Sequence, residues 1–165
     1  MDFDYDIIPG HGIGQLRFGL SKEKIIDIIG VPDTTSEHKD PESGKTTVFY
    51  YAKKGITAYF EEEDDYCLSS FEIENPHMVF LDEKIYRFTK DQVVALLEKN
   101  DFKITSEEYV KPNEIEGKTS IKDEALEFCI SVDDIEINFY FFDDRLLSVQ
   151  FGVLFDDNDE VSWPV

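Results

Sequence analysis

The chain has 165 residues, of which 41% are hydrophobic and 14% aromatic. This length and apolar content exclude wholesale disorder and leave room for one ordinary core or two small abutting cores. Asp and Glu number 37 against 16 Lys and Arg, which gives a formal net charge of -21 at pH 7. A field of this sign repels nucleic-acid phosphates and anionic membranes and attracts basic proteins, so we expect a basic protein partner, no nucleic acid and no membrane. The alternative is that the acidity only secures solubility.

The first residues favour a cytoplasmic protein. Residues 1–6 lack the basic start and apolar run of a signal peptide, and no stretch approaches the roughly 18 apolar residues of a membrane span. Two cysteines, Cys67 and Cys129, do not make a disulfide framework. We therefore expect cytoplasmic localisation and two reduced packing thiols.

Two short segments have the sequence signals that are typical of α-helices. Ser21 is a good N-cap for a helix ending at Ile29, with an apolar stripe of Ile25, Ile28 and Ile29 and a stop at Gly30. A second helix is expected over 89–99, where Gln92 completes a capping box on Thr89. Thr89 follows Ser21 by 68 residues (89 minus 21), and the pattern around it matches position by position, which favours an internal duplication.

Alternating residues predict a group of strands after each helix. We expect a short opening strand at 5–8, strands at 46–52, 56–61 and 68–74, and then strands at 126–132, 135–142 and 146–151. In the last strand Leu147, Val149 and Phe151 are expected on the core face. The predicted fold is α+β, with two tandem repeats (1–76 and 77–165), each a helix packed on an antiparallel meander. The meanders would be able to form one continuous curved sheet with the helices on one face.

No pattern nominates an active site, so we expect a non-enzymatic chain without a cofactor or metal. The three histidines have no metal-ligand spacing, and no serine lies in a G-x-S-x-G elbow. The acidic stretch 156–160 is the best cation candidate, but it lacks the glycine and distant glutamate of an EF-hand loop. The alternative function is therefore a small Ca²⁺-binding or hydrolytic domain that uses its acidic loops.

The solvent-facing side of the predicted sheet is the better candidate surface. Aromatic and polar residues share this register, a mixture typical of protein contacts, although ordinary cross-strand pairing is the competing interpretation. A run of five acidic residues is expected at a hairpin tip. The candidate partner-binding residues are Tyr59, Tyr140, Phe142, Glu136, Asn138 and Gln150 on the sheet, and Glu61, Glu62, Glu63, Asp64 and Asp65 at the tip.

Residues 18–33, with Phe18-Gly19-Leu20-Ser21 at one end and Gly30-Val31-Pro32-Asp33 at the other, resemble the signature of SmpA/OmlA-type domains. Two such modules in tandem resemble the beta-lactamase inhibitor protein fold, whose curved sheet carries helices on one side and grips an enzyme with the other. This chain lacks a lipoprotein cysteine and the inhibitor's paired cysteines, so neither an outer-membrane role nor lactamase inhibition carries over. The resemblance implies a protein-binding scaffold, such as an immunity or inhibitor protein that caps a basic toxin.

Overall fold

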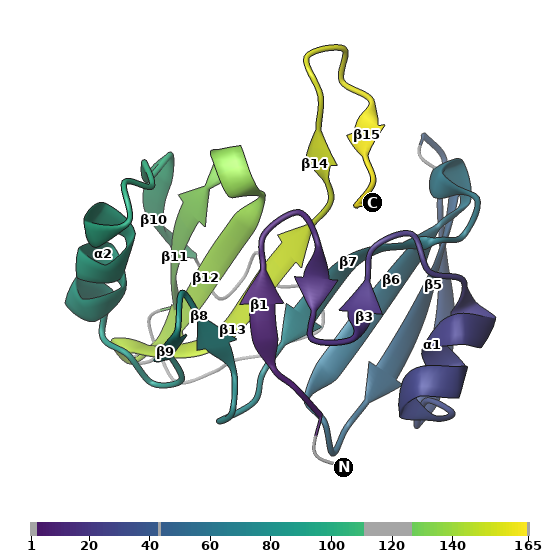
Figure 1. Cartoon of the computed structure of the whole chain (residues 1–165), viewed down its shortest axis with the longest axis horizontal. Helices are drawn as coiled ribbons and strands as arrows, with labels where there is room; N and C mark the ends of the chain where they lie inside the picture. Colours follow the sequence, from purple (N-terminus) through teal and green to yellow (C-terminus); the bar gives the residue numbers. More distant parts are fainter. Residues whose placement is uncertain (1–2, 43, 111–126, 165) are drawn as a thin grey trace.

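The computed structural model describes residues 3–42, 44–110 and 127–164, and most of its regular structure is β-strand (Figure 1). Both predicted helices are confirmed, as α1 (Lys22–Ile29) and α2 (Lys90–Lys99). Ser21 Oγ accepts the Lys24 N–H at 3.2 Å, and Thr89 forms the full capping box with Gln92. Neither helix is long and apolar enough to cross a lipid bilayer.

The largest element is an antiparallel sheet of eight strands in the order β10-β11-β12-β13-β7-β6-β5-β4. The junction between β13 and β7 aligns Phe151 with Phe71 and joins strands from the two halves of the sequence. Position 126, the expected start of one strand, lies outside the described residues. The strands are β4 (Thr34–Asp40), β5 (Gly44–Tyr51), β6 (Ile56–Glu61), β7 (Leu68–Ile73), β10 (Ser106–Val110), β11 (Glu127–Val132), β12 (Ile137–Phe142) and β13 (Arg145–Gly152).

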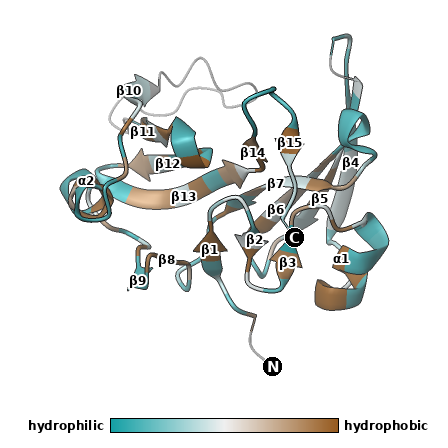
Figure 2. Ribbon diagram, turned by 45° about the horizontal axis from the view of Figure 1, so that its top comes forward, coloured by the Kyte–Doolittle hydropathy of each residue, from teal (hydrophilic) through white to brown (hydrophobic). Residues whose placement is uncertain are grey.

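A second sheet of five short strands lies against this large sheet, in the order β3-β2-β1-β8-β9. The predicted opening strand is confirmed as β1, which pairs in parallel with β8 and thus joins the N-terminal residues to the middle of the chain. The strands are β1 (Asp6–Ile8), β2 (Gly12–Ile13), β3 (Leu16–Arg17), β8 (Val79–Phe80) and β9 (Glu83–Lys84). A third sheet is the hairpin of β14 (Leu154–Phe155) and β15 (Val161–Ser162), which projects from the body and has a hydrophilic turn (Figure 2).

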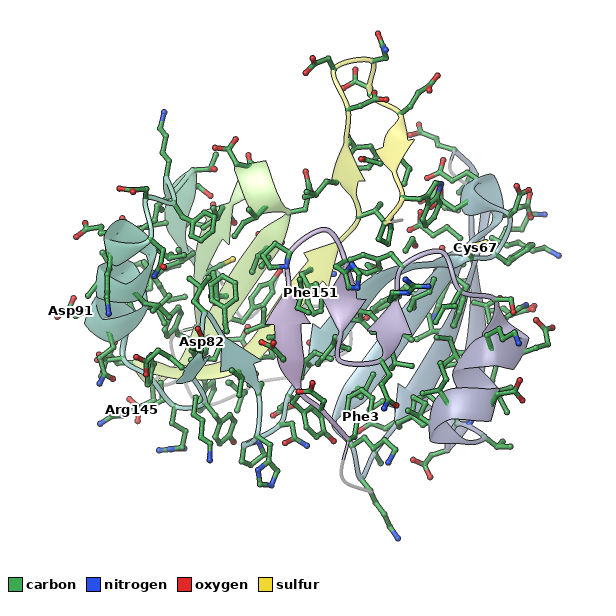
Figure 3. The ribbon with its side chains drawn as sticks, in the orientation of Figure 1. Phe3, Cys67, Asp82, Asp91, Arg145 and Phe151 are labelled. Atoms are coloured by element: carbon green, nitrogen blue, oxygen red, sulfur yellow. The ribbon has the colours of Figure 1, made fainter. Side chains whose placement is uncertain are left out.

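The core lies between the large sheet and the layer that covers it. The five-stranded sheet lies over the middle of the large sheet, and α1 and α2 flank it on the same side (Figure 1). Aromatic rings fill the space between the layers. The ring centroids of Phe18 and Phe71 are 5.5 Å apart, and those of Phe80 and Phe139 are 5.7 Å apart. Phe151, from the central strand β13, is buried in this core near the middle of the molecule (Figure 3).

The predicted fold class, α+β with tandem helix-on-meander repeats, is wrong. Among the described residues, strands dominate, only two α-helices occur, and the strands form three sheets. The strands of both halves share one eight-stranded sheet, and short strands drawn from the segments around α1 and α2 cover its centre. The helices are too short to cover a sheet of this width, so the five-stranded sheet buries the apolar residues that remain.

The apolar stripe of α1 is also narrower than predicted. Ile25 is fully buried, whereas Ile28 is 38% exposed. Ile29 and Ile26 pack against the edge of the core. An eight-residue helix at the margin of the sheet turns only part of its apolar surface inward, so one predicted core position faces water.

A register shift in β12 and β13 changes which leucine is buried. Tyr140 aligns with Ser148, but Phe141 aligns with Leu146, so Leu147 is the extra residue of a β-bulge. Leu146 is fully buried, and Leu147 is only partly buried. The prediction that Leu147 lies on the core face is therefore wrong, because strict alternation along the strand does not anticipate an extra residue.

Candidate functional site

We call the side of the large sheet opposite the helices and the five-stranded sheet the outer face. Side chains alternate across the sheet, so residues paired across strands stand on the same face in rows. One row runs from Thr57 through Glu72 and Gln150 to Asn138, across β6, β7, β13 and β12. The junction between β7 and β13 thus brings together outward-facing residues that are far apart in the chain.

Two tyrosines flank this row and are tied to it by hydrogen bonds. Tyr59 donates its hydroxyl to Glu72 Oε2 at 3.4 Å, and Tyr140 donates to Gln150 Oε1 at 3.1 Å. Glu72 and Gln150 are cross-strand partners. We call these four residues the outer-face patch. Its phenol rings are held in place by polar partners, as is usual for half-buried tyrosines at contact surfaces.

The electrostatics of the patch keep both phenols protonated. The pKa of Tyr59 is raised to about 12, mainly because the phenol is half-buried and to a smaller extent because the Glu72 carboxylate is close. The pKa of Tyr140 is also raised to about 12, mainly by burial and to a smaller extent by the nearby Cys129 and Glu72. Both hydroxyls therefore remain hydrogen-bond donors at neutral pH, beside a carboxylate that supplies negative charge.

Cys129 lies next to Tyr140 in the sheet and is not an activated nucleophile. It is buried, and its Sγ is 3.7 Å from Ser131 Oγ. Burial raises the pKa of this thiol, and burial also raises the pKa of Cys67. Both cysteines are free, and a raised pKa keeps each of them in the less reactive thiol form.

A pocket of about 270 Å³ opens on the outer face beside the patch. Ser148, a small residue among larger neighbours, is cross-strand to Tyr140 and contributes to the pocket lining. The bulge places Leu147 in the same lining. The pocket is lined by Glu72, Glu74, Glu127, Tyr140, Phe141, Phe142, Leu147, Ser148 and Gln150.

The structure separates the sequence-predicted site into three parts. Tyr59, Tyr140 and Gln150 belong to the patch, while Asn138 and Phe142 stand near it on the outer face. Glu136 lies outside β12, which begins at Ile137. Instead, Glu136 ends a 3₁₀ turn with a positive φ of 50°, and its backbone carbonyl accepts the Gly152 N–H.

The five acidic residues 61–65 form the tip between β6 and β7, which we call the acidic tip. The tip and Glu74 lie at opposite ends of β7, so roughly 20 Å separates them at about 3.3 Å per residue over this six-residue strand. In Figure 3, Cys67, two residues after the tip, and Arg145, the cross-strand partner of Phe142, lie on opposite sides of the molecule. The acidic tip therefore does not line the pocket.

Three carboxylates of the tip lie together. Oxygens of Glu61, Glu63 and Asp64 are within 4.8 Å of one another. Burial, then the neighbouring Glu63, raises the pKa of Glu61, and burial, then Glu63 and Asp65, raises the pKa of Asp64. Such a group of oxygens has the ligand type that Ca²⁺ prefers, although acidic clusters on loops are common without an ion.

The other cation candidate, residues 156–160, has a structural explanation. Asp156 Oδ1 accepts the backbone N–H of Asn158 at 2.8 Å and that of Glu160 at 3.0 Å. This carboxylate therefore closes the turn between β14 and β15. Its role in the turn is the one that Asp commonly plays in tight loops.

A hydroxyl and an imidazole come together on the edge strand β4, where Ser36 Oγ is 3.3 Å from His38 Nε2. His38 is exposed, and among the described residues β4 is an edge strand that pairs with β5 alone. Water competes for both groups there, so the contact does not have the dry, preorganised surroundings that nucleophilic catalysis uses.

Several pocket residues were not nominated from the sequence. Glu72 follows the outward alternation of its strand and could have been found from that pattern. Ser148 follows the same outward alternation in its own strand. Glu74 and Glu127 could not have been found, because their proximity to the pocket depends on which strands become neighbours. The chain matches no protein-family model, no curated protein and no solved structure.

Proposed function

We propose that this chain is a non-enzymatic, acidic protein-binding module that docks a basic protein on the outer face of its large sheet. The observation that carries the proposal is the outer-face patch beside a pocket lined by aromatic and acidic side chains. Tyrosine and phenylalanine bury large areas at little conformational cost, and polar neighbours orient them, which is the composition of interface hot spots.

The net charge supports a basic partner. At a formal charge of -21, long-range attraction would raise the rate at which a positively charged protein meets this surface. The same field opposes nucleic acids and anionic membranes. An immunity or inhibitor protein that caps a basic toxin would use charge in this way.

The dimensions of the sheet also suit a protein partner. Eight strands about 4.8 Å apart, each about six residues long, cover roughly 38 by 20 Å. That area is close to the roughly 800 Å² that each partner buries in a standard protein interface. The helices and the five-stranded sheet occupy the other side, so docking on the outer face would not disturb the core (Figure 1). We place the interaction in the cytoplasm, where the two free cysteines would stay reduced.

The test compares three versions of the full-length chain as bait for basic proteins of the native host, with products of neighbouring genes tried first. Tyr140→Ala/Phe142→Ala removes two aromatic side chains from the outer face. Phe155→Ala/Trp163→Ala removes two exposed aromatic side chains near the C-terminus and is the matched control. A basic protein bound by wild type and control but lost from the Tyr140/Phe142 variant supports the proposal. Equal binding by all three versions contradicts it.

Association and dissociation rates then separate the contribution of direct contacts from that of long-range charge attraction. The Tyr140/Phe142 variant is expected to dissociate faster at a nearly unchanged association rate. Neutralising residues 61–65 of the acidic tip is expected to lower the association rate and its dependence on salt. A tip variant that mainly dissociates faster would place the tip inside the interface.

The Ca²⁺-binding alternative is favoured by one observation, the proximity of the Glu61, Glu63 and Asp64 carboxylates. A specific site predicts that millimolar Ca²⁺ raises the melting temperature of chelator-treated protein more than Mg²⁺ does. Glu63→Gln would remove that difference if the tip is the site. An equal response to both cations would indicate general charge screening and would remove this alternative.

A further inference from the structure

The pocket on the outer face has the size of a side chain. Its volume of about 270 Å³ is below the roughly 300 to 1,000 Å³ typical of small-molecule sites. Ser148 leaves room between Tyr140 and the end of β7, where larger residues would close the space. A projecting side chain of a docked protein fits this shape better than a cofactor or metabolite does.

The lining combines aromatic and acidic groups. Tyr140 and Phe142 come from β12. Glu72 comes from β7, and Glu74 directly follows the end of that strand. The Tyr59 hydroxyl bonds to Glu72, and the Tyr140 hydroxyl bonds to Gln150, so the positions of these polar groups are set by their neighbours. The pocket therefore offers planar apolar surfaces beside fixed oxygen acceptors.

Among basic side chains, arginine matches this combination best. Its planar guanidinium stacks on aromatic rings and donates paired hydrogen bonds to carboxylates. It is also more weakly hydrated than the lysine ammonium, so it loses less on entering a half-buried pocket. Lysine could satisfy the charge but not the planar surfaces.

We infer that this pocket receives an arginine side chain of the basic partner, stacked against Tyr140 and Phe142 and hydrogen-bonded by the carboxylates of Glu72 and Glu74. The inference rests on the proposed function, since it names the group that the outer face recognises. It makes the pocket the place where a partner's arginine is distinguished from its lysines.

The experiment titrates the ¹⁵N-labelled full chain with a neutral-ended tripeptide, acetyl-Gly-Arg-Gly-amide, at low ionic strength and follows amide shifts by NMR. Saturable shifts are expected around Glu72, Tyr140 and Ser148, with the matching lysine peptide binding at least about fivefold more weakly. Arginine and lysine peptides that bind equally, or shifts spread over the acidic tip, would overturn the inference.

Two variants test the pocket itself. Ser148→Leu fills the pocket without changing its charge and is expected to weaken binding of the arginine peptide at least about tenfold. Ser106→Leu, on the edge strand β10, is the control and is expected to leave binding unchanged. Glu74→Gln, at an exposed position, should weaken binding severalfold and keeps the test valid if Ser148→Leu does not fold. Glu160→Gln, which makes the same change in the β14–β15 turn, is its control. Unchanged binding by Glu74→Gln would contradict the assignment.

The peptide result is independent of partner capture. Peptide binding in the pocket without any outer-face protein partner would contradict the proposed function and leave only the preference of the pocket for arginine standing. A protein partner that needs Tyr140 and Phe142, together with no preference for the arginine peptide, would sink the pocket assignment alone.

Discussion

Leu146 and Leu147 are neighbours in sequence that the bulge sends to different places. Leu146 is fully buried between the sheet and its covering layer, whereas Leu147 lines the pocket on the outer face. Replacing each with alanine should therefore have unequal effects. Strict alternation from Val149 and Phe151 predicts the opposite order, so the pair tests the observed register directly.

The expected cost follows from what each substitution removes. Leu146→Ala deletes three buried carbons at about 0.8 kcal/mol each, and the cavity left in a packed core brings the loss to about 3 to 5 kcal/mol. Leu147→Ala removes the same atoms from a partly exposed wall and should cost about 1 kcal/mol or less.

Urea denaturation followed by circular dichroism measures both losses. With a slope of about 2 kcal/mol per molar urea, Leu146→Ala should lower the midpoint by about 1.5 to 2.5 M and Leu147→Ala by about 0.5 M or less. Unchanged slopes are the control for two-state behaviour. A Leu147→Ala variant that loses more stability than Leu146→Ala would show that the alternation continues, and would refute both the bulge and the pocket wall.

Three further outcomes are expected from denaturation. Gly55→Ala should cost at least about 2 kcal/mol, because φ is 63° there and an added Cβ would clash with the Glu74 carbonyl oxygen. Ile25→Ala should cost about 2 to 5 kcal/mol and Ile28→Ala less than about 1 kcal/mol, and equal losses would mean that α1 is rotated. The raised pKa of Glu61 means that the folded state holds its proton at a higher pH than the unfolded state does. The free energy of unfolding should therefore rise as the pH falls from 7 through the raised pKa, and Glu61→Gln should reduce that rise; a fall over this range would contradict the argument.

Features set by neighbouring residues could be predicted from the sequence. Both helix starts were found because Ser21 and Thr89 cap backbone groups only three residues away. The outward placement of Tyr59 and Tyr140 was found because alternation within one strand needs no knowledge of its partners. These signals depend on contacts close in sequence, where propensity and periodicity are informative.

Features that depend on distant pairing were missed. The pairing of β1 with β8, which builds the covering sheet, has no local signature in strands as short as two residues. The pairing of β13 with β7 places Gln150 beside Glu72, and neither segment alone indicates the other. The bulge at Leu147 reverses the alternation at one position, which a period-two pattern cannot anticipate. The fold class and the pocket depend on these contacts, so the sequence predicted the elements better than their assembly.

The central claim is that the outer face is the surface that contacts a basic protein. Cross-saturation NMR with methyl-labelled chain, bound to the basic partner that is lost from the Tyr140/Phe142 variant, measures this directly. The account predicts attenuated methyl signals for Leu147 and Val48 on the outer face, with Ile28 and Val31 on the side of α1 unaffected. Attenuation of Ile28 and Val31, with unchanged signals for Leu147 and Val48, would place the partner on the helical side and contradict the account.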